Sequence, residues 1–176
     1  MSYPSSPAPT QSYGNWPVNS YPRDRAVRAD VVAAVLLIVG GGAGIAQLWV
    51  PWMNAGVENG TTTGWQFFQG IKRMMPGVGF SYTFAAYAIL AVAVVGVAMV
   101  LLGVLMLLPL DHRPAGIVAV VAGVIGVVCA VWWVFWGPVG DDLAERFRYA
   151  WIGWYLFLVA GIVGLIGAIK SLVSAD

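Results

Sequence analysis

The sequence predicts an all-α integral membrane protein: a bundle of four transmembrane helices behind a disordered, proline-rich N-terminal tail. Three observations predict this fold class. The 176-residue chain is 60% hydrophobic with a mean hydropathy of +0.79, whereas soluble domains are about 45–50% apolar. Only 10% of its residues are charged, which is too few to cover a soluble surface. Four apolar runs of 20 or more residues follow one another along the chain.

Residues 1–28 form the predicted tail. This segment is rich in Pro, Ser, Tyr, Asn and Gln and shows neither strand nor helix periodicity, so it cannot bury enough apolar surface to offset the entropy of ordering. It also lacks the basic start, apolar core and cleavage site of a signal peptide. We therefore expect the first apolar helix to be retained as an anchor of the domain formed by residues 29–176.

The four expected spans cover about residues 31–50, 82–108, 115–136 and 149–173. Each is long enough to cross a hydrocarbon core of roughly 30 Å, which takes about 20 helical residues. Pro51, Pro109 and Gly137-Pro138 end the first three spans. The fourth contains one charge, Lys170, close enough to its end to reach the headgroups. We expect the fourth helix to begin outside the membrane, at Asp141, a natural N-cap.

Both termini are predicted to be cytoplasmic, in the plasma (inner) membrane. Four spans place the N-terminus, the loop at 109–114 and the C-terminus on one side, with five Lys or Arg residues against four on the other. Arg23, Arg25 and Arg28 directly precede the first span. Positive charge beside the first helix favours the cytoplasmic side.

The non-cytoplasmic side is expected to carry eight of the nine tryptophans. An interfacial aromatic belt explains tryptophans near span ends, but it predicts aromatic residues on both faces of the membrane. Two interpretations therefore stay open: a plain belt, or an added docking surface for lipid or a partner. The residues predicted to make the partner or lipid contact are Trp65, Phe68, Trp132, Trp133 and Trp136.

The loop over residues 51–81 contains a short amphipathic pattern. Apolar Trp65, Phe68, Ile71 and Met75 fall three or four residues apart, with polar residues between them. This spacing predicts a helix that ends at Pro76-Gly77. The helix would lie in the membrane interface or pack against the protein's own helices.

Small residues recur at a spacing of seven in the last three spans. Such a stripe keeps one helix against a neighbour in a left-handed crossing and lets the two backbones approach closely. The pattern does not separate packing within the chain from packing against a partner. The residues predicted to pack are Gly96, Gly103, Gly116, Gly123, Gly153 and Gly167.

No motif for catalysis, metal or cofactor binding is recognisable, so the chain is not expected to be an enzyme. Residues 40–44 are glycine-rich but lack the strand and the Gly-Lys-Ser/Thr of a phosphate loop. His112 is the only histidine and cannot complete a metal site alone. Asp141, Asp142 and Glu145 could bind a cation together, although a helix start paired with nearby arginines explains them more simply.

Polar residues are scarce within the spans. The candidates are Gln47, Thr83, Tyr87 and Cys129, and Cys129 is expected to be a small buried packing residue. Proton relays and ion pathways need ionisable groups at membrane depth, so a stand-alone ion-coupled transporter is disfavoured. A lipid-handling protein needs no such groups. The net charge of +1 gives no reason to expect nucleic acid as a partner.

The chain resembles small actinobacterial four-helix membrane proteins, through the tail Tyr3-Pro4-Ser5-Ser6-Pro7 and the Val/Ala/Gly-rich spans. Some such proteins are accessory subunits of mammalian-cell-entry type lipid transporters or of respiratory supercomplexes. The resemblance is one of style and carries no functional residue over. It implies a non-catalytic accessory or structural subunit of a larger membrane complex, with lipid transport across the cell envelope as the favoured setting. Its partners would be other integral membrane subunits and membrane lipids.

Alternatives to that interpretation remain open. The chain could be a free-standing lipid-binding or membrane-organising protein, or an accessory subunit of a respiratory complex. A membrane enzyme acting on lipid ranks third.

Overall fold

The computed structural model describes residues 29–54, 61–74, 77, 79–108, 113–137 and 142–174. The predicted tail, His112 and Asp141 lie outside these residues. The described part is predominantly helical, which confirms the all-α class, and it adds one two-stranded antiparallel sheet that the sequence did not predict. The elements are α1 (Val31–Ala46), β1 (Pro51–Asn54), β2 (Thr61–Thr63), α2 (Gly64–Met74), α3 (Phe80–Met106), α4 (Arg113–Trp136), α5 (Leu143–Tyr149) and α6 (Ile152–Ser174).

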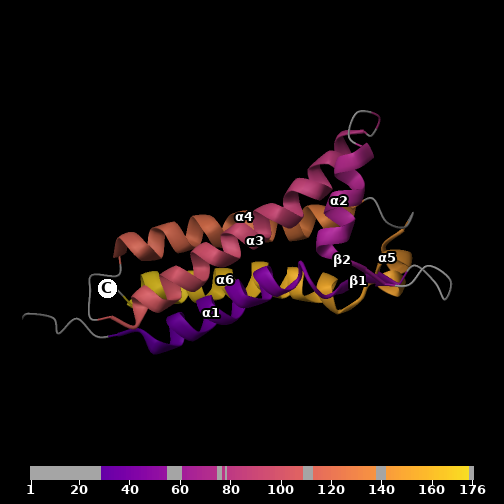
Figure 1. Cartoon of the computed structure of the whole chain (residues 1–176). Coiled ribbons are helices and arrows are strands. Elements are labelled where there is room, and N and C mark those ends of the chain that lie inside the picture. The colour runs from indigo at the N-terminus through magenta and orange to yellow at the C-terminus, as the bar shows by residue number, and fades with distance from the viewer. Residues whose placement is uncertain are drawn as a thin grey trace, which may run out of the picture.

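Helices α1, α3, α4 and α6 run side by side along the length of the molecule (Figure 1). Helix α1 packs against α3 and α6, and α4 packs against the same two helices, so the four surround a common axis. The end where α1 begins and α6 finishes is called the tail end. Strands β1 and β2 pair as an antiparallel hairpin. They lie with α2 and α5 at the opposite end, here called the hairpin end (Figure 1). The elements that the sequence assigned to one side of the membrane therefore gather at one end of the molecule.

Within the described ranges, three helices are long and apolar enough to cross a membrane: α3, α4 and α6, with 27, 24 and 23 residues. They are compatible with a multi-pass membrane protein, and their bounds agree with the predicted spans to within three residues. Helix α1 has 16 residues, or about 24 Å at 1.5 Å per residue, against a hydrocarbon core of roughly 30 Å. The prediction of helix over 31–50 is therefore wrong for residues 47–50.

Tertiary hydrogen bonds explain why α1 ends early. The Gln47 side chain turns inward and donates from Nε2 to the carbonyl oxygen of Ile89, at 3.0 Å. The Gln47 carbonyl accepts the indole N–H of Trp52 at 2.7 Å, and the Leu48 carbonyl accepts the backbone N–H of Trp65 at 2.9 Å. Buried carbonyls that leave a helix need other partners, and the hairpin and α2 provide them for the two residues that follow α1.

The predicted continuous fourth helix from Asp141 is also wrong, because the chain forms two helices. Asp142 caps α5, with its side chain accepting the backbone N–H of Glu145 at 2.7 Å. The chain is then extended before α6, where the backbone N–H of Trp151 donates to the carbonyl of Trp52 at 2.9 Å. That contact with the hairpin interrupts the helix.

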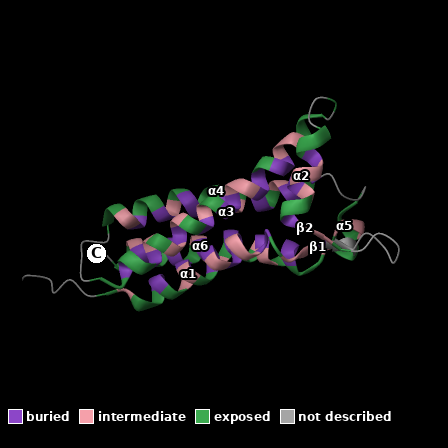
Figure 2. Cartoon of the chain, in the orientation of Figure 1, coloured by how far each residue is buried: buried purple, intermediate pink, exposed green. Residues whose placement is uncertain are grey.

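Many of the buried residues of the bundle are small, and large apolar side chains cover its exterior. Exposed residues occur along all four long helices (Figure 2). The buried alanines include Ala33, Ala34, Ala85, Ala86, Ala88, Ala119, Ala160 and Ala168. The exposed side chains include Val35 and Val39 on α1, Val94 and Leu101 on α3, Val121 and Val128 on α4, and Ile162 and Ile166 on α6.

Glycines allow α1 to approach its neighbours closely. A Cβ on Gly96 of α3 would lie 2.6 Å from the carbonyl oxygen of Gly41, and one on Gly40 would lie 2.6 Å from the backbone nitrogen of Gly164 in α6. The glycine-rich segment 40–44 is thus a helix-packing surface inside α1.

All six glycines predicted to pack are buried against another element of the same chain. Gly96 and Gly103 face α1, as does Gly167, while Gly116 and Gly123 face α6. Gly153 differs, because it faces the β1 residue Trp52 and not a helix.

Candidate functional site

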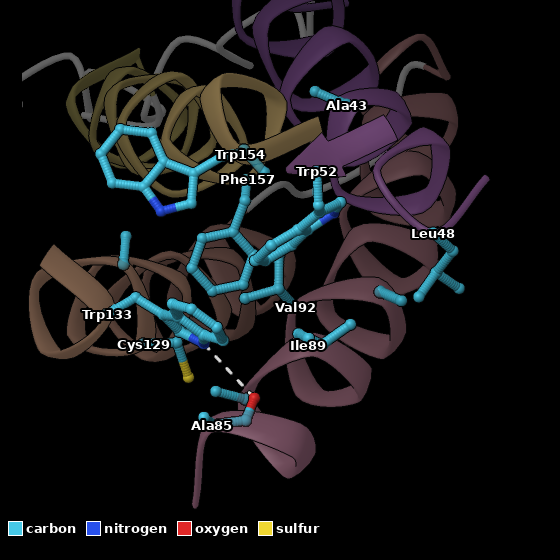
Figure 3. Packing of buried hydrophobic residues seen from close by; sticks show 14 residues of the cluster. Ala43, Leu48, Trp52, Ala85, Ile89, Val92, Cys129, Trp133, Trp154 and Phe157 are labelled. Carbon is cyan, nitrogen blue, oxygen red and sulfur yellow. Dashed lines mark hydrogen bonds between the residues drawn. The ribbon is translucent and has the colours of Figure 1, made fainter. Parts of the chain in front are cut away.

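A cluster of buried aromatic side chains fills the hairpin end of the bundle. Trp52 of β1 lies at its centre and is fully buried. Its ring meets Trp133 of α4 and Phe157 of α6 edge-on, with centroids 5.2 and 5.1 Å apart. Figure 3 shows these three rings converging from different elements. Such edge-to-face pairs add to the stabilisation from area burial alone.

Two glycines make room for the Trp52 indole. A Cβ on Gly64 would lie 2.7 Å from the indole nitrogen, and one on Gly153 would lie 3.0 Å from the same atom. The indole N–H is paired with the Gln47 carbonyl, so its one donor is satisfied. Trp52 therefore connects the hairpin to α1, α2 and α6.

Two of the five predicted contact residues belong to the interior, and their assignment to an outer surface needs correction. Trp133 is 2% exposed and donates its indole N–H to the carbonyl of Ala85 at 3.3 Å (Figure 3). Phe68 is buried against Ala86 of α3. Their burial is a tertiary effect: α2 and α3 close over positions that look peripheral in the sequence.

The other three predicted contact residues reach the surface to different degrees. Trp65 is 44% exposed and Trp136 is 60% exposed. Trp132 is half-buried, with its ring 4.4 Å from that of Phe84, centroid to centroid. Trp65 and Trp136 are therefore the members of the predicted set that are free to contact lipid or a partner.

Exposed aromatic side chains surround the hairpin end. We call them the aromatic girdle, and every helix contributes to it or adjoins it. Among the residues that the structure describes, the exposed large side chains at the tail end are aliphatic instead, for example Val31, Val32, Leu107 and Val173. The girdle consists of Trp49, Trp65, Phe80, Tyr82, Tyr87, Phe135, Trp136, Phe147, Trp151 and Tyr155.

The predicted amphipathic helix exists as α2, and it packs on α3. Phe68 and Ile71 form its buried face, in contact with the N-terminal half of α3. Its exposed face carries Trp65 together with Lys72 and Arg73 in the last turn. This arrangement matches the predicted packing on the protein's own helices and leaves a basic, aromatic face uncovered.

The polar residues expected within the spans divide into two kinds. Gln47 is fully buried, and its Oε1 atom has no hydrogen-bond partner in the described structure. Cys129 is buried in the aromatic cluster, as expected. Tyr87 is exposed, so it is not an interior polar group. Of the residues described, no three from His, Cys, Asp and Glu are placed to hold a metal ion.

An acidic residue at the tail end, Asp30, was not among the predicted site residues. Asp30 caps α1, accepting the backbone N–H of Ala33 at 3.0 Å, and its Oδ2 atom lies 3.6 Å from Nζ of Lys170. Burial alone would raise the pKa of Asp30, but the Ala33 N–H, Ser174 and the Lys170 ammonium outweigh it and hold the pKa below its ordinary value. An Asp immediately before an apolar run is a helix-start signal that could have identified this residue.

Comparisons with protein-family models, with curated proteins and with solved structures found no significant match for this chain. A function is therefore argued from the chain's own residues.

Proposed function

We propose that this chain is an integral membrane protein in which α1, α3, α4 and α6 all cross the bilayer. The distribution of side chains carries this proposal: Gly and Ala lie at many of the buried contacts between helices, while exposed Val, Leu or Ile side chains occur on each of the four helices. Water would penalise that exterior. Lipid would not, and in lipid helices associate through the close backbone contacts that small residues allow.

The short α1 is compatible with a crossing that the hairpin completes. Irregular backbone is tolerated at membrane depth where its polar groups are paired inside the protein. The carbonyls of Gln47, Leu48 and Trp52 all accept hydrogen bonds from other parts of the chain. We propose that the tail end, which adjoins the three arginines of the N-terminal segment, faces the cytoplasm.

We further propose a non-catalytic accessory or structural role in a larger membrane complex, with lipid transport across the cell envelope as the setting. The support is an asymmetry: aromatic side chains cover one end of the bundle and aliphatic ones the other. A belt that only set membrane depth would favour both ends. Other integral membrane subunits and lipids would be the partners, through the side formed by α2, α3 and α4, where Trp65 and Trp136 are exposed.

The alternative is a free-standing lipid-binding or membrane-organising protein. One observation favours it: α3, α4 and α6 contribute to the girdle and Trp49 follows the end of α1, so the girdle surrounds the bundle as an interfacial belt would. A second alternative keeps the accessory role but places the chain in a respiratory complex.

Purification of the tagged chain in mild detergent tests these functions. A partner set at fixed stoichiometry supports the accessory role, and a lone species supports the free-standing alternative. The discriminating variant is Trp65→Ala with Trp136→Ala. Its matched control, Trp49→Ala with Trp151→Ala, removes two exposed indoles from the α1 and α6 side of the same end.

Docking through the α2–α4 side predicts that only the first pair of substitutions weakens co-purification. Truncating a tryptophan anchor in an interface costs about 2 kcal/mol, or roughly thirtyfold in affinity. Both variants should remain inserted in the membrane. Equal, small effects of the two pairs would leave the girdle with only an anchoring role.

A further inference from the structure

The last turn of α2 presents two adjacent positive charges. Lys72 and Arg73 are both exposed, and α2 contains no acidic residue. Within the described part of the chain, neither cation has an ion-pair partner. Exposed neighbouring cations repel each other, so binding of an anion at this face is favourable.

The position of α2 suggests which anion. Figure 1 shows α2 lying across the direction of the long helices at the hairpin end. Phe68 and Ile71 anchor it on α3, which leaves the basic turn pointing outward. Trp65 on the same helix belongs to the aromatic girdle, and aromatic side chains of this kind favour headgroup depth.

We propose that the exposed face of α2, centred on Lys72 and Arg73, binds the headgroup of an anionic phospholipid in the leaflet on the hairpin side. The inference rests on the membrane location proposed above. The Arg73 guanidinium can hold a phosphate through two parallel N–H donors, and the Lys72 ammonium adds a point charge. Trp65, an exposed girdle residue on the same helix, would hold this face at headgroup depth in the bilayer proposed above. That depth favours the headgroup of a lipid over free phosphate.

A structural role for the same charges makes a different prediction. Basic residues in the last turn of a helix interact favourably with its dipole whatever surrounds them. Their removal would then weaken the protein equally in neutral and anionic lipid. Lipid binding predicts an effect in anionic lipid alone.

The test uses the full chain in nanodiscs of phosphatidylcholine alone, or of phosphatidylcholine with a minority of phosphatidylglycerol. Phosphatidylglycerol retained per protein is measured by mass spectrometry after detergent extraction, and its affinity by titration. The variant is Lys72→Gln with Arg73→Gln. The charge-preserving control is Lys72→Arg with Arg73→Lys, and Arg113→Gln removes a charge at the tail end.

Wild type should retain phosphatidylglycerol above its bulk fraction. The double glutamine variant should bind it about thirtyfold more weakly, at about fivefold per charge near an anionic surface. The two controls should bind within about twofold of wild type. In phosphatidylcholine alone, all variants should have equal thermal stability.

Unchanged retention in the double glutamine variant would overturn the lipid site while leaving the membrane location intact. Equal loss of stability in both lipids would assign the two charges to the helix dipole. Binding of inorganic phosphate as tight as that of the lipid would overturn the choice of ligand, and charge-dependent capture of an acidic partner subunit with no change in lipid would assign the face to a protein. Failure of wild type to enter phosphatidylcholine nanodiscs would refute the membrane location itself, and the lipid site with it.

Discussion

Two adjacent glycines of α1 offer a direct test of how this bundle is held together. A Cβ on Gly41 would overlap the carbonyl oxygen of Gly96 and would lie 2.9 Å from the backbone nitrogen of Val100, both in α3. A Cβ on Gly42 would meet nothing within 4 Å. Gly41→Ala and Gly42→Ala thus differ only in whether the added methyl group has room.

The expected difference follows from these distances. The atoms facing Gly41 include α3 backbone atoms, which cannot rotate away. The two helices would have to separate by about 1 Å to restore ordinary contact with the Gly96 carbonyl oxygen, and overpacking of this kind costs typically about 1–3 kcal/mol. Replacing Gly by Ala in a helix gains up to about 1 kcal/mol at either position, and that gain cancels in the comparison. Gly41→Ala should therefore be less stable than Gly42→Ala by about 1–3 kcal/mol.

Unfolding of the purified variants in mild detergent or nanodiscs measures this difference, by heat or by titration with a denaturing detergent. Gly42→Ala should match or exceed wild type. If Gly41→Ala proves as stable as Gly42→Ala, α1 and α3 are not in close contact at this level, and the glycine-based account of the bundle is refuted.

Three further predictions concern polarity, charge and orientation. Gln47→Leu should change the stability by no more than about 1 kcal/mol, because the lost hydrogen bond to Ile89 is offset by removal of the unpartnered Oε1. Thermal unfolding of Gln47→Leu and of Gln47→Ala measures this, and an equal loss of stability in the two variants would contradict the prediction. The pKa of Asp30 is lowered in the fold. Its contribution to the stability of the fold is therefore complete above the ordinary carboxyl pKa of about 3.9 and is lost as the pH falls through the folded-state pKa. Asp30→Asn should therefore lower the melting temperature at neutral pH and flatten its acid dependence, and an unchanged profile would remove Asp30 from the account. In intact cells, Thr62→Cys should react with an impermeant thiol reagent and Ser12→Cys should not; the reverse pattern would invert the orientation.

The long apolar helices could be predicted from the sequence because their signal is local. About 20 consecutive apolar residues favour a helix in lipid whatever the rest of the chain does. The predicted bounds of α3 and α4 are accurate for this reason. The packing glycines were likewise visible as a seven-residue repeat, since the repeat is a property of one helix.

The two helix ends predicted wrongly depend on residues far away in the chain. Residues 47–50 continue an apolar run, so nothing local ends the helix before Pro51. The helix stops where Trp52 and α2 supply hydrogen-bond donors to the carbonyls of Gln47 and Leu48, which directly follow its last residue. The interruption before α6 likewise depends on a backbone contact with the hairpin.

The candidate site shows the same division. Composition alone placed most tryptophans at one side of the molecule, because they cluster near the ends of apolar runs. Which of them are exposed was not predictable. Trp132 and Trp133 are adjacent in the sequence, yet only Trp133 lies inside the bundle with its N–H paired.

The sequence by itself determined the all-α class, the positions of the long apolar helices and the small residues at their contacts, because each of these depends on residues within one helix. Only the tertiary structure decided the length of α1, the presence of the hairpin and the packing of Trp52 between Gly64 and Gly153. It also decided which aromatic residues form the buried cluster and which form the exposed girdle. Those features depend on hydrogen bonds and ring contacts between segments as much as a hundred residues apart, and local periodicity does not predict which segments contact one another.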